Sequence, residues 1–199
     1  MKTNSDKNLE VRTTCRACES NNFFEGLNFG MMPIANELMS TRQIHYEEFP
    51  LEFTVCSDCG LGQILHDINP ERLFSDYRYT SSTSATTLQH SQTFAERMQK
   101  ELLLDCEGYV LEIACNDGYL LKSFAELGLK CIGVDPAINL ATQIVDSHIE
   151  IEIGFFGSQL ASELLETHVY PKLIIAKNVL AHVPDINDVM LGLNVLCNE

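Results

Sequence analysis

Short apolar stretches and helical spacings alternate along the second half of the chain. Four stretches rich in Val, Ile and Leu predict strands, at residues 109–114, 130–134, 149–153 and 172–176. Segments with apolar residues at helical spacing follow them, at residues 119–127, 138–145, 159–166 and 186–196, and Gly128 is expected to end the first. Strands that alternate with helices favour right-handed βαβ units. The pattern therefore predicts an α/β fold with a Rossmann-like, doubly wound parallel sheet, incomplete because four strands are few for such a sheet.

The first half of the chain has a different pattern. Residues 15–70 are rich in Cys, Gly, Pro and Asn, with short β-prone pieces such as residues 51–55, which predicts a small loop-rich unit. The spacing then becomes helical, and one face of this helix would carry Leu88, Phe94, Met98, Leu102 and Leu103. We therefore expect an N-terminal domain at residues 1–70, a connector and helix at 71–105, and a partial Rossmann-like domain at 106–199.

Composition and charge exclude several classes of protein. The chain has 199 residues, 45% of them hydrophobic, which is enough for a packed core. A formal net charge of -15 would repel a phosphate backbone, so we expect no nucleic-acid partner. The first ten residues are polar, and no apolar run approaches the roughly 20 residues of a membrane span. We therefore expect a cytoplasmic protein without a membrane partner.

Two C-x-x-C pairs predict a metal site. Cys15 and Cys18 form the first pair, and Cys56 and Cys59 form the second. Each spacing lets two thiolates bind one tetrahedral zinc ion, and four thiolates leave no position for water, so the zinc would be structural. Unrelated turns with buried free thiols are the alternative, and a redox pair is less favoured because neither pair opens a helix after a strand. The other four cysteines lack this spacing and are expected to be small core residues: Cys106, Cys115, Cys131 and Cys197.

The loop after the first predicted strand is a candidate cofactor site, within the sequence V-L-E-I-A-C-N-D-G-Y-L-L. A dinucleotide fingerprint would place glycines where Ala114 and Asn116 stand, and only Gly118 matches it. Asn116 and Asp117 would direct polar and anionic side chains at a diphosphate, which is unfavourable for NAD. S-adenosylmethionine has no phosphate and carries a sulfonium and an amino-acid end. Acidic and amide groups such as Glu112 and Asn116 therefore favour it.

The ends of the other predicted strands carry further candidates. Asp135 follows the second strand at the position of an acidic residue that binds ribose hydroxyls. Phe155 and Phe156 follow the third strand and would flank an adenine ring, and His182 lies just past the fourth. Ordinary structural roles are the alternative: a turn before Pro136, backbone capping by Glu112, and core packing by the phenylalanines and the histidine. Their combination at successive strand ends favours a ligand.

Several longer motifs resemble one known family. They are P-I-A-N at residues 33–36, C-S-D-C-G-L-G-Q at 56–63, Y-R-Y-T-S-S-T-S at 77–84, L-E-I-A-C-N-D-G-Y-L-L at 111–121, G-V-D-P at 133–136 and N-V-L-A-H-V-P-D-I at 178–186. With both cysteine pairs, they resemble the zinc-containing class I S-adenosylmethionine-dependent sugar C-methyltransferases over almost the whole chain. The resemblance implies a zinc-bearing domain, a methyltransferase domain and a C-terminal domain. The last is absent here, so we expect a chain truncated at its C-terminus.

The resemblance also implies roles for individual residues. The methyl donor S-adenosylmethionine would contact Glu112, Ala114, Asn116, Asp117, Gly118, Asp135, Pro136, Phe155, Phe156 and Asn178. The small-molecule acceptor would be a nucleotide-linked keto-deoxysugar, methylated on carbon through an enolate. His182, Tyr77 and Tyr79 would face this substrate as catalytic residues. His90 is a weaker candidate, because a surface histidine is equally expected there.

Three alternatives stay open at this stage. A chain that lacks the C-terminal part of the family would bind S-adenosylmethionine without catalysis. An NAD-dependent sugar-modifying enzyme would use a similar sheet, although Asn116 and Asp117 argue against it. A zinc-ribbon nucleic-acid binder would use the cysteines, although the acidic balance argues against it.

Overall fold

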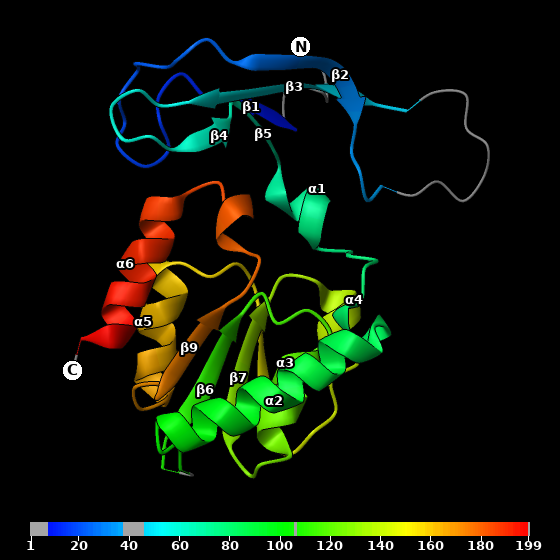
Figure 1. Ribbon diagram of the computed structural model, residues 1–199, viewed down its shortest axis with the longest axis vertical. Coiled ribbons are helices and arrows are strands. Elements are labelled where there is room, and N and C mark those ends of the chain that lie inside the picture. Colours follow the sequence, from blue (N-terminus) through cyan, green and yellow to red (C-terminus); the bar gives the residue numbers. More distant parts are fainter. Residues whose placement is uncertain (1–7, 38–45, 106, 199) are drawn as a thin grey trace. The chain divides into compact units, whose positions relative to one another are not determined.

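The computed structural model describes residues 8–37, 46–105 and 107–198, and the chain forms two compact units (Figure 1). The first unit comprises Met1–Phe74 and Pro184–Asn187, and the second comprises Ser75–Val183 and Asp188–Glu199. Across the described ranges, no helix combines the length and the apolar character that crossing a bilayer requires.

Short antiparallel strands build the first unit. β1 (Leu9–Val11) pairs with β5 (His66–Ile68), and the short helix α1 (Pro70–Phe74) follows β5. A second sheet has the order β2-β3-β4, with β2 (Leu27–Pro33), β3 (Glu48–Val55) and β4 (Gly62–Ile64). The β-prone residues 51–55 fall in β3, as the sequence predicts.

A four-stranded parallel sheet forms the centre of the second unit. Its strands are β6 (Tyr109–Ile113), β7 (Lys130–Asp135), β8 (Ile149–Ile153) and β9 (Leu173–Ala176), in the order β8-β7-β6-β9. All of β6 is buried, because the strand has a neighbour on each side and both faces of the sheet are covered. The predicted Rossmann-like parallel sheet is confirmed. Its strand order reverses between β6 and β9, and the ligand crevice of such a sheet lies beyond the carboxyl ends of these strands.

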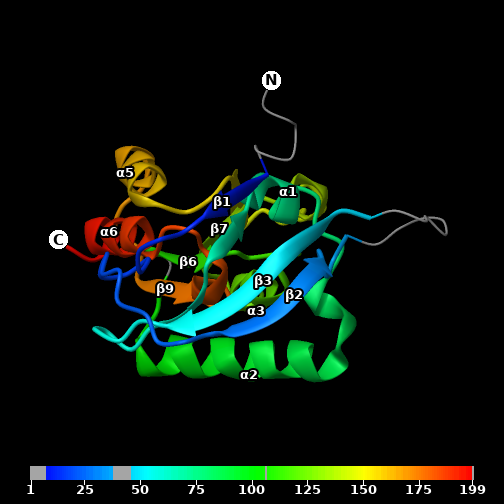
Figure 2. The same ribbon diagram turned by 90° about the horizontal axis from the view of Figure 1, so that it is seen from above.

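Helices cover both faces of this sheet, with α2 and α3 on one face and α5 and α6 on the other (Figure 2). The helices are α2 (Ala85–Glu101), α3 (Tyr119–Ala125), α4 (Ile138–Ala141), α5 (Ser158–Thr167) and α6 (Ile186–Cys197). One core packs Val110 of β6 with Phe124 of α3, and the other packs Leu111 of β6 with Leu164 of α5. Neighbouring residues of β6 therefore enter different cores, as the period of a strand requires.

The helix α2 ends earlier than its apolar spacing predicts. Its last residue is Glu101, and Leu103 beyond it is 83% exposed with a left-handed φ of 50°. Leu88 and Leu102 are also exposed, and of the five residues predicted to share one helix face, Phe94 and Met98 pack against the core. The buried positions of α2 are the small residues Ser91 and Ala95, because small side chains let α2 pack closely on α3.

The ends of α3 and α4 differ in how well the sequence predicts them. Gly128 has a φ of 78°, and its N–H bonds to the carbonyl of Ala125 at 2.8 Å, which confirms the predicted glycine stop after α3. The helix α4 ends at Ala141, four residues before the predicted end at residue 145. Val145 is 91% exposed, so it has no core position that would extend the helix.

The cysteines outside the two pairs have different environments. Cys115 and Cys131 are buried, as predicted, and burial raises the pKa of both thiols. The prediction that Cys197 is a core residue is wrong, because it is exposed in the last turn of α6. Its neighbour Leu196 takes the core-facing position, and adjacent residues of a helix point in different directions. Cys106 lies outside the described residues.

Gly133 of β7 leaves no room for a side chain. An added Cβ would lie 2.6 Å from Sγ of Cys115 and 2.8 Å from the Cδ1 atoms of Leu121 and Ile151. We expect Gly133→Ala to lower the free energy of unfolding of the second unit by about 1–3 kcal/mol, as in overpacked cores. Urea unfolding followed by far-ultraviolet circular dichroism measures this, because the long helices belong to the second unit.

The control for this variant is Gly154→Ala, because no atom lies within 4 Å of a Cβ added at Gly154. The control should unfold close to the wild-type urea midpoint. Equal midpoints for the two variants would contradict the packing explanation.

Candidate functional site

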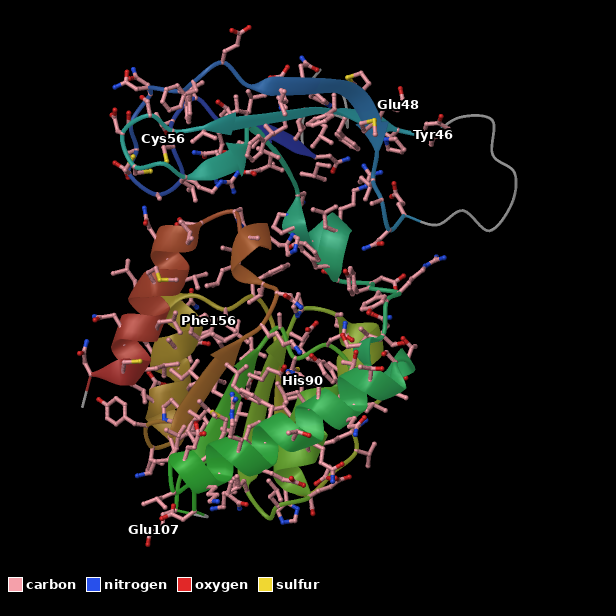
Figure 3. The ribbon with its side chains drawn as sticks, viewed as in Figure 1. Tyr46, Glu48, Cys56, His90, Glu107 and Phe156 are labelled. Atoms are coloured by element: carbon pink, nitrogen blue, oxygen red, sulfur yellow. The ribbon has the colours of Figure 1, made fainter. Side chains whose placement is uncertain are left out.

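The two C-x-x-C pairs form two equivalent turns in the first unit. The N–H of Glu19 bonds to the carbonyl of Cys15 at 2.9 Å, and the N–H of Gly60 bonds to the carbonyl of Cys56 at 2.9 Å (Figure 3 labels Cys56). Glu19 and Gly60 both have left-handed φ values, 60° and 78°. Each pair is therefore followed by one left-handed residue that reverses the chain and leaves the sulfurs together.

The distances between the four sulfurs fit a tetrahedral zinc ion. Sγ of Cys15 lies 3.6 Å from Sγ of Cys59, and the same distance separates Cys18 from Cys56. All four sulfurs lie within 4.8 Å of one another. Zinc–sulfur bonds of about 2.3 Å give sulfur–sulfur edges of about 3.8 Å, whereas a disulfide requires about 2.05 Å. The cluster fits a structural zinc site of four thiolates.

The pKa values of Cys15 and Cys18 are shifted in opposite directions. Burial would raise the pKa of Cys15, but the backbone N–H groups of Cys18 and Ala17 and the side chain of Gln63 outweigh it and lower the pKa to about 6. The backbone N–H of Ser20 lowers the pKa of Cys18, but burial and the other sulfurs outweigh it and raise the pKa to about 12. A divalent cation at the centre of the cluster would relieve the repulsion between the four thiolates.

The loop after β6 has a left-handed backbone at three alternate positions. Ala114, Asn116 and Gly118 have φ values of 58°, 55° and 69°. The first two glycines of a dinucleotide fingerprint would fall at Ala114 and Asn116, so the loop has a glycine-like backbone there without glycine. A non-glycine residue in this conformation costs about 1–2 kcal/mol. Strain of this kind is concentrated at ligand sites, which supports the loop as a binding element.

Asp135, at the end of β7, holds this loop in place. Its Oδ2 accepts a hydrogen bond from the N–H of Asn116 at 2.7 Å, and its Oδ1 accepts one from the N–H of Ala137 at 2.8 Å. Burial raises the pKa of the Asp135 carboxyl, although these two N–H groups partly offset the effect. One carboxylate therefore ties together the segments that follow β6 and β7. Pro136, between Asp135 and Ala137, is half-buried.

Two carboxylates of this site are buried and incompletely bonded. Glu112 Oε2 and Asp117 Oδ1 have no hydrogen-bond partner among the described residues. Glu112 is 2% exposed and Asp117 is 9% exposed. Burial raises the pKa of Glu112 well above its usual range, Lys177 lowers it, and Asp135 and Asp117 raise it further. Because a buried carboxylate oxygen without a donor is costly, both atoms fit a ligand that brings a cation or hydroxyl groups.

Lys177 is a site residue that the sequence analysis missed. It directly follows β9, its charge acts on Glu112, and its Nζ lies 5.6 Å from the ring centroid of Tyr119 at the start of α3. The lysine therefore places a positive charge among the acidic groups at the carboxyl edge of the sheet. The sequence signal that could have identified Lys177 was its position directly after the fourth predicted strand.

The connector before α2 lies against the loop after β6. The side-chain oxygen of Asn116 accepts a hydrogen bond from the N–H of Ser81 at 2.9 Å, and its amide nitrogen donates to the carbonyl of Tyr79 at 3.0 Å. The second oxygen of Asp117, Oδ2, accepts from the N–H of Ser82 at 3.1 Å. Tyr79 is 58% exposed, whereas Tyr77 is half-buried. The structure thus brings the backbone of Tyr79 to the predicted cofactor loop, whereas the backbone of Tyr77 bonds to Asn139 of α4.

The residues after β8 and β9 have different environments. Phe156 is buried in the core with Leu164, and Phe155 is 44% exposed (Figure 3 labels Phe156). Asn178, after β9, is exposed and has a left-handed φ of 56°. His182 is exposed in the short 3-10 turn Leu180–His182 that follows. Of the two phenylalanines, only Phe155 presents an accessible ring to a ligand.

His90 lies on α2 (labelled in Figure 3), and its side chain is exposed. Its ring stacks on Phe94 of the same helix, with 6.4 Å between ring centroids. Its exposure and its stacking within α2 fit a surface histidine.

Two family models match the chain. Residues 15–74 match the family described as "Putative zinc binding domain", and residues 86–199 match the family described as "Methyltransferase domain". A curated relative, the C-methyltransferase NovU of Streptomyces niveus, is 31% identical over 184 residues. The match covers 92% of this chain and 44% of NovU, so the chain spans less than half the length of this relative.

Two solved structures are similar to parts of the chain. A SAM-dependent methyltransferase of Anabaena variabilis is 16% identical, with a TM-score of 0.43 over 53% of this chain and 46% of its own. The magnesium protoporphyrin IX methyltransferase ChlM of Synechocystis is 18% identical, with a TM-score of 0.32 over 61% and 59%. At these TM-scores, neither likeness supports a conclusion about function.

The methyltransferase-domain match runs from the start of α2 to the end of the chain and covers more than half of it. The zinc-binding match contains both equivalent cysteine turns. The chain therefore belongs to the methyltransferase family, within the group whose members carry a zinc-binding N-terminal domain.

Proposed function

We propose that the protein is an S-adenosylmethionine-dependent C-methyltransferase that acts on a nucleotide-linked keto-deoxysugar. The methyltransferase-domain match and the C-methyltransferase NovU as a relative support the class of reaction. The motifs at residues 77–84 and 178–186 support the sugar acceptor through their resemblance to the sugar C-methyltransferases.

One observation carries the donor assignment: the two buried carboxylate oxygens of Glu112 and Asp117 that lack a partner among the described residues. S-adenosylmethionine offers an ammonium group, a sulfonium and ribose hydroxyls, which would satisfy both atoms. A pyrophosphate would instead meet carboxylates at short range, which is repulsive. The same observation therefore argues against an NAD-dependent enzyme.

Asp135 has capacity left for a ligand. Each carboxylate oxygen can accept two hydrogen bonds, and each oxygen of Asp135 uses one of them for a backbone N–H. We assign the remaining capacity to the ribose hydroxyls of the donor. Ala114, Asn116 and Gly118 would let the backbone approach the donor closely, because their left-handed conformation turns the chain at each alternate residue.

In this proposal, the residues that act on the acceptor sugar are His182, Tyr77 and Tyr79. One of these groups removes the proton next to the ketone of the sugar, and another donates a hydrogen bond to the enolate oxygen. When bound, the donor would supply an electrophilic methyl group on a positively charged sulfur. The enolate carbon would take this methyl group, and the sulfur would keep the electrons of the broken bond. His182 is exposed in the turn after β9, where an imidazole can exchange a proton with the substrate.

The zinc site has a structural role in this proposal. Four thiolates complete the coordination of the ion, so no position is open for a substrate oxygen. The ion would join the turn at Cys15–Cys18 to the turn at Cys56–Cys59, and thereby fix the ends of a first unit whose strands are short.

We expect the purified chain to contain about one zinc ion, and Cys56→Ser to reduce the zinc content at least about tenfold, since a four-thiolate site cannot lose a ligand without opening. Elemental analysis measures the content, and cobalt substitution should give the absorption of a tetrahedral thiolate centre. Cys197→Ser is the matched control, because this exposed cysteine lies on α6. Equal zinc content in both variants would contradict the four-cysteine site.

We expect Glu112→Gln to weaken binding of S-adenosylhomocysteine by about 10- to 100-fold, because the variant loses one charged hydrogen bond to the ligand. The same variant should unfold at a higher urea concentration without ligand, because it removes a buried charge. Isothermal titration calorimetry and urea unfolding measure the two effects. Glu126→Gln, an exposed carboxylate at the end of α3, should change neither quantity.

The stability difference at Glu112 should depend on pH. The pKa of Glu112 is raised in the folded chain above its unfolded value near 4.5. The protonated form of Glu112 therefore contributes fully to the free energy of unfolding below pH 4.5, and this contribution is lost as the pH rises towards the folded pKa. The advantage of Glu112→Gln should therefore grow with pH across that window. A wild-type affinity for S-adenosylhomocysteine in Glu112→Gln would refute the donor assignment.

The enolate step can be tested with a nucleotide-linked 4-keto-deoxysugar in deuterated water. We expect deuterium to enter the carbon next to the ketone, and His182→Asn to slow this exchange at least about 100-fold, within the range for a general acid or base. Mass spectrometry measures both exchange and methyl transfer. Donor binding with neither exchange nor transfer would favour a donor-binding protein without catalysis over the enzyme.

A further inference from the structure

A short segment of the connector, residues 77–82, is held by side chains at both of its ends, and we call it the connector strap. At its first residue, the side-chain oxygen of Asn139 accepts a hydrogen bond from the N–H of Tyr77 at 3.0 Å. The amide nitrogen of Asn139 donates to the carbonyl of Tyr77 at 2.8 Å. One asparagine thus pairs with both backbone groups of one tyrosine, as a neighbouring strand would.

The other end of the connector strap has the same kind of anchor. Asn116 binds the carbonyl of Tyr79 and the N–H of Ser81, and Asp117 binds the N–H of Ser82. Asn116 keeps its place although its left-handed conformation favours glycine. The amide side chain that glycine would lack is the one that holds the strap, which explains why asparagine is useful at this position.

Both anchors lead back to Asp135. Its carboxylate binds the N–H of Asn116 and the N–H of Ala137, the residue that precedes α4. Asn139 lies in the first turn of α4, two residues after Ala137. The same carboxylate therefore positions both asparagines, and a donor that binds Asp135 lies at the junction of the two anchors.

A role of Asn139 within its own helix does not explain its contacts. Other side chains of this segment bond back to the helix: Thr142 donates to the carbonyl of Ile138 at 2.8 Å, and Gln143 donates to the carbonyl of Asn139 at 2.6 Å. Asn139 instead uses both its donor and its acceptor on Tyr77, which is 62 positions away in the chain.

We propose that Asn139 is a positioning residue that clamps Tyr77, so that the connector strap and its tyrosines stay fixed beside the loop that binds the methyl donor. The clamp itself rests on the contacts above, and its link to the donor rests on the proposed function. Loss of the clamp removes both hydrogen bonds between Asn139 and the backbone of Tyr77, and thus one of the two anchors of the strap.

Amide hydrogen exchange of the whole chain tests the clamp without any ligand. We expect Asn139→Leu to speed exchange at the N–H of Tyr77 about tenfold, the loss of side-chain hydrogen bonds of ordinary strength. Thr142→Val is the matched control, because it removes a hydrogen bond that stays within the same segment. Unchanged exchange at Tyr77 in Asn139→Leu, or an equal effect of Thr142→Val, would overturn the clamp.

The conservative variant Asn139→Asp gives a second readout. A carboxylate still accepts from the N–H of Tyr77 but faces its carbonyl without a donor, whereas the protonated acid offers donor and acceptor again. Exchange at Tyr77, corrected for the intrinsic pH dependence of exchange, should return towards wild type as the pH falls in Asn139→Asp and not in Asn139→Leu. A return in both variants, or in neither, would contradict the pairing.

Calorimetry with S-adenosylhomocysteine tests the link to the donor. We expect the affinity to fall about threefold to tenfold in Asn139→Leu and to stay at the wild-type value in Thr142→Val, as a positioning contact worth about one hydrogen bond implies. Faster exchange with wild-type affinity would overturn the link and leave the clamp standing. A wild-type chain that binds no S-adenosylhomocysteine would instead overturn the proposed function, and the exchange result would still decide the clamp.

Discussion

The carboxylate of Asp135 is the constraint on which the geometry of the candidate site depends. Its two oxygens bind the N–H groups of Asn116 and Ala137, and these bonds join the loop after β6 to the segment that leads into α4. A charged acceptor between two backbone donors is a strong arrangement, because each bond is charge-assisted. The left-handed residues of the loop are costly on their own, so they need such an external bond to persist.

The site contains a buried carboxylate and a strained backbone, both of which lower the stability of the fold. The two apolar cores around the sheet must offset this loss. Glu112 is charged only at a cost in its buried position, and Ala114 and Asn116 occupy a strained backbone region. The cores on either side contain well-packed residues such as Phe124 and Leu111, each of which stabilises the fold through buried apolar area. A protein can keep a destabilised binding edge when the layers beneath it are closely packed. At a position in such an edge, the residue that best stabilises the fold differs from the residue that best binds the ligand.

The sequence predicts the parts of this protein that depend on local pattern. Apolar runs located β6, β7 and β9, because a strand covered on both faces needs a nearly continuous apolar run. The alternation of Ile and Glu located β8, a partly exposed strand at the edge of the sheet. The spacing of the cysteines located the metal cluster, because two short turns suffice to gather four sulfurs. The position of Asp135 at a strand end followed from the topology of such sheets.

Features that depend on contacts between distant segments were out of reach. No local signal indicates that Asn139 pairs with Tyr77, since 62 positions separate them. The exposure of Leu103 and Cys197 depends on where α2 ends and which side of α6 faces the core. Phe155 and Phe156 look equivalent in sequence, and only the packing of Phe156 with α5 separates them.

The distribution of the cysteines has a practical consequence for labelling. A thiol reacts through its thiolate, and burial hinders both ionisation and access at Cys115 and Cys131. Zinc bound to the four-cysteine cluster would protect the thiolates of Cys15 and its partners. Among the described cysteines, Cys197 combines exposure with freedom from the cluster. Of the described cysteines, Cys197 is therefore the one at which a fluorophore or spin label would attach, on the last turn of α6, where it would report on that helix.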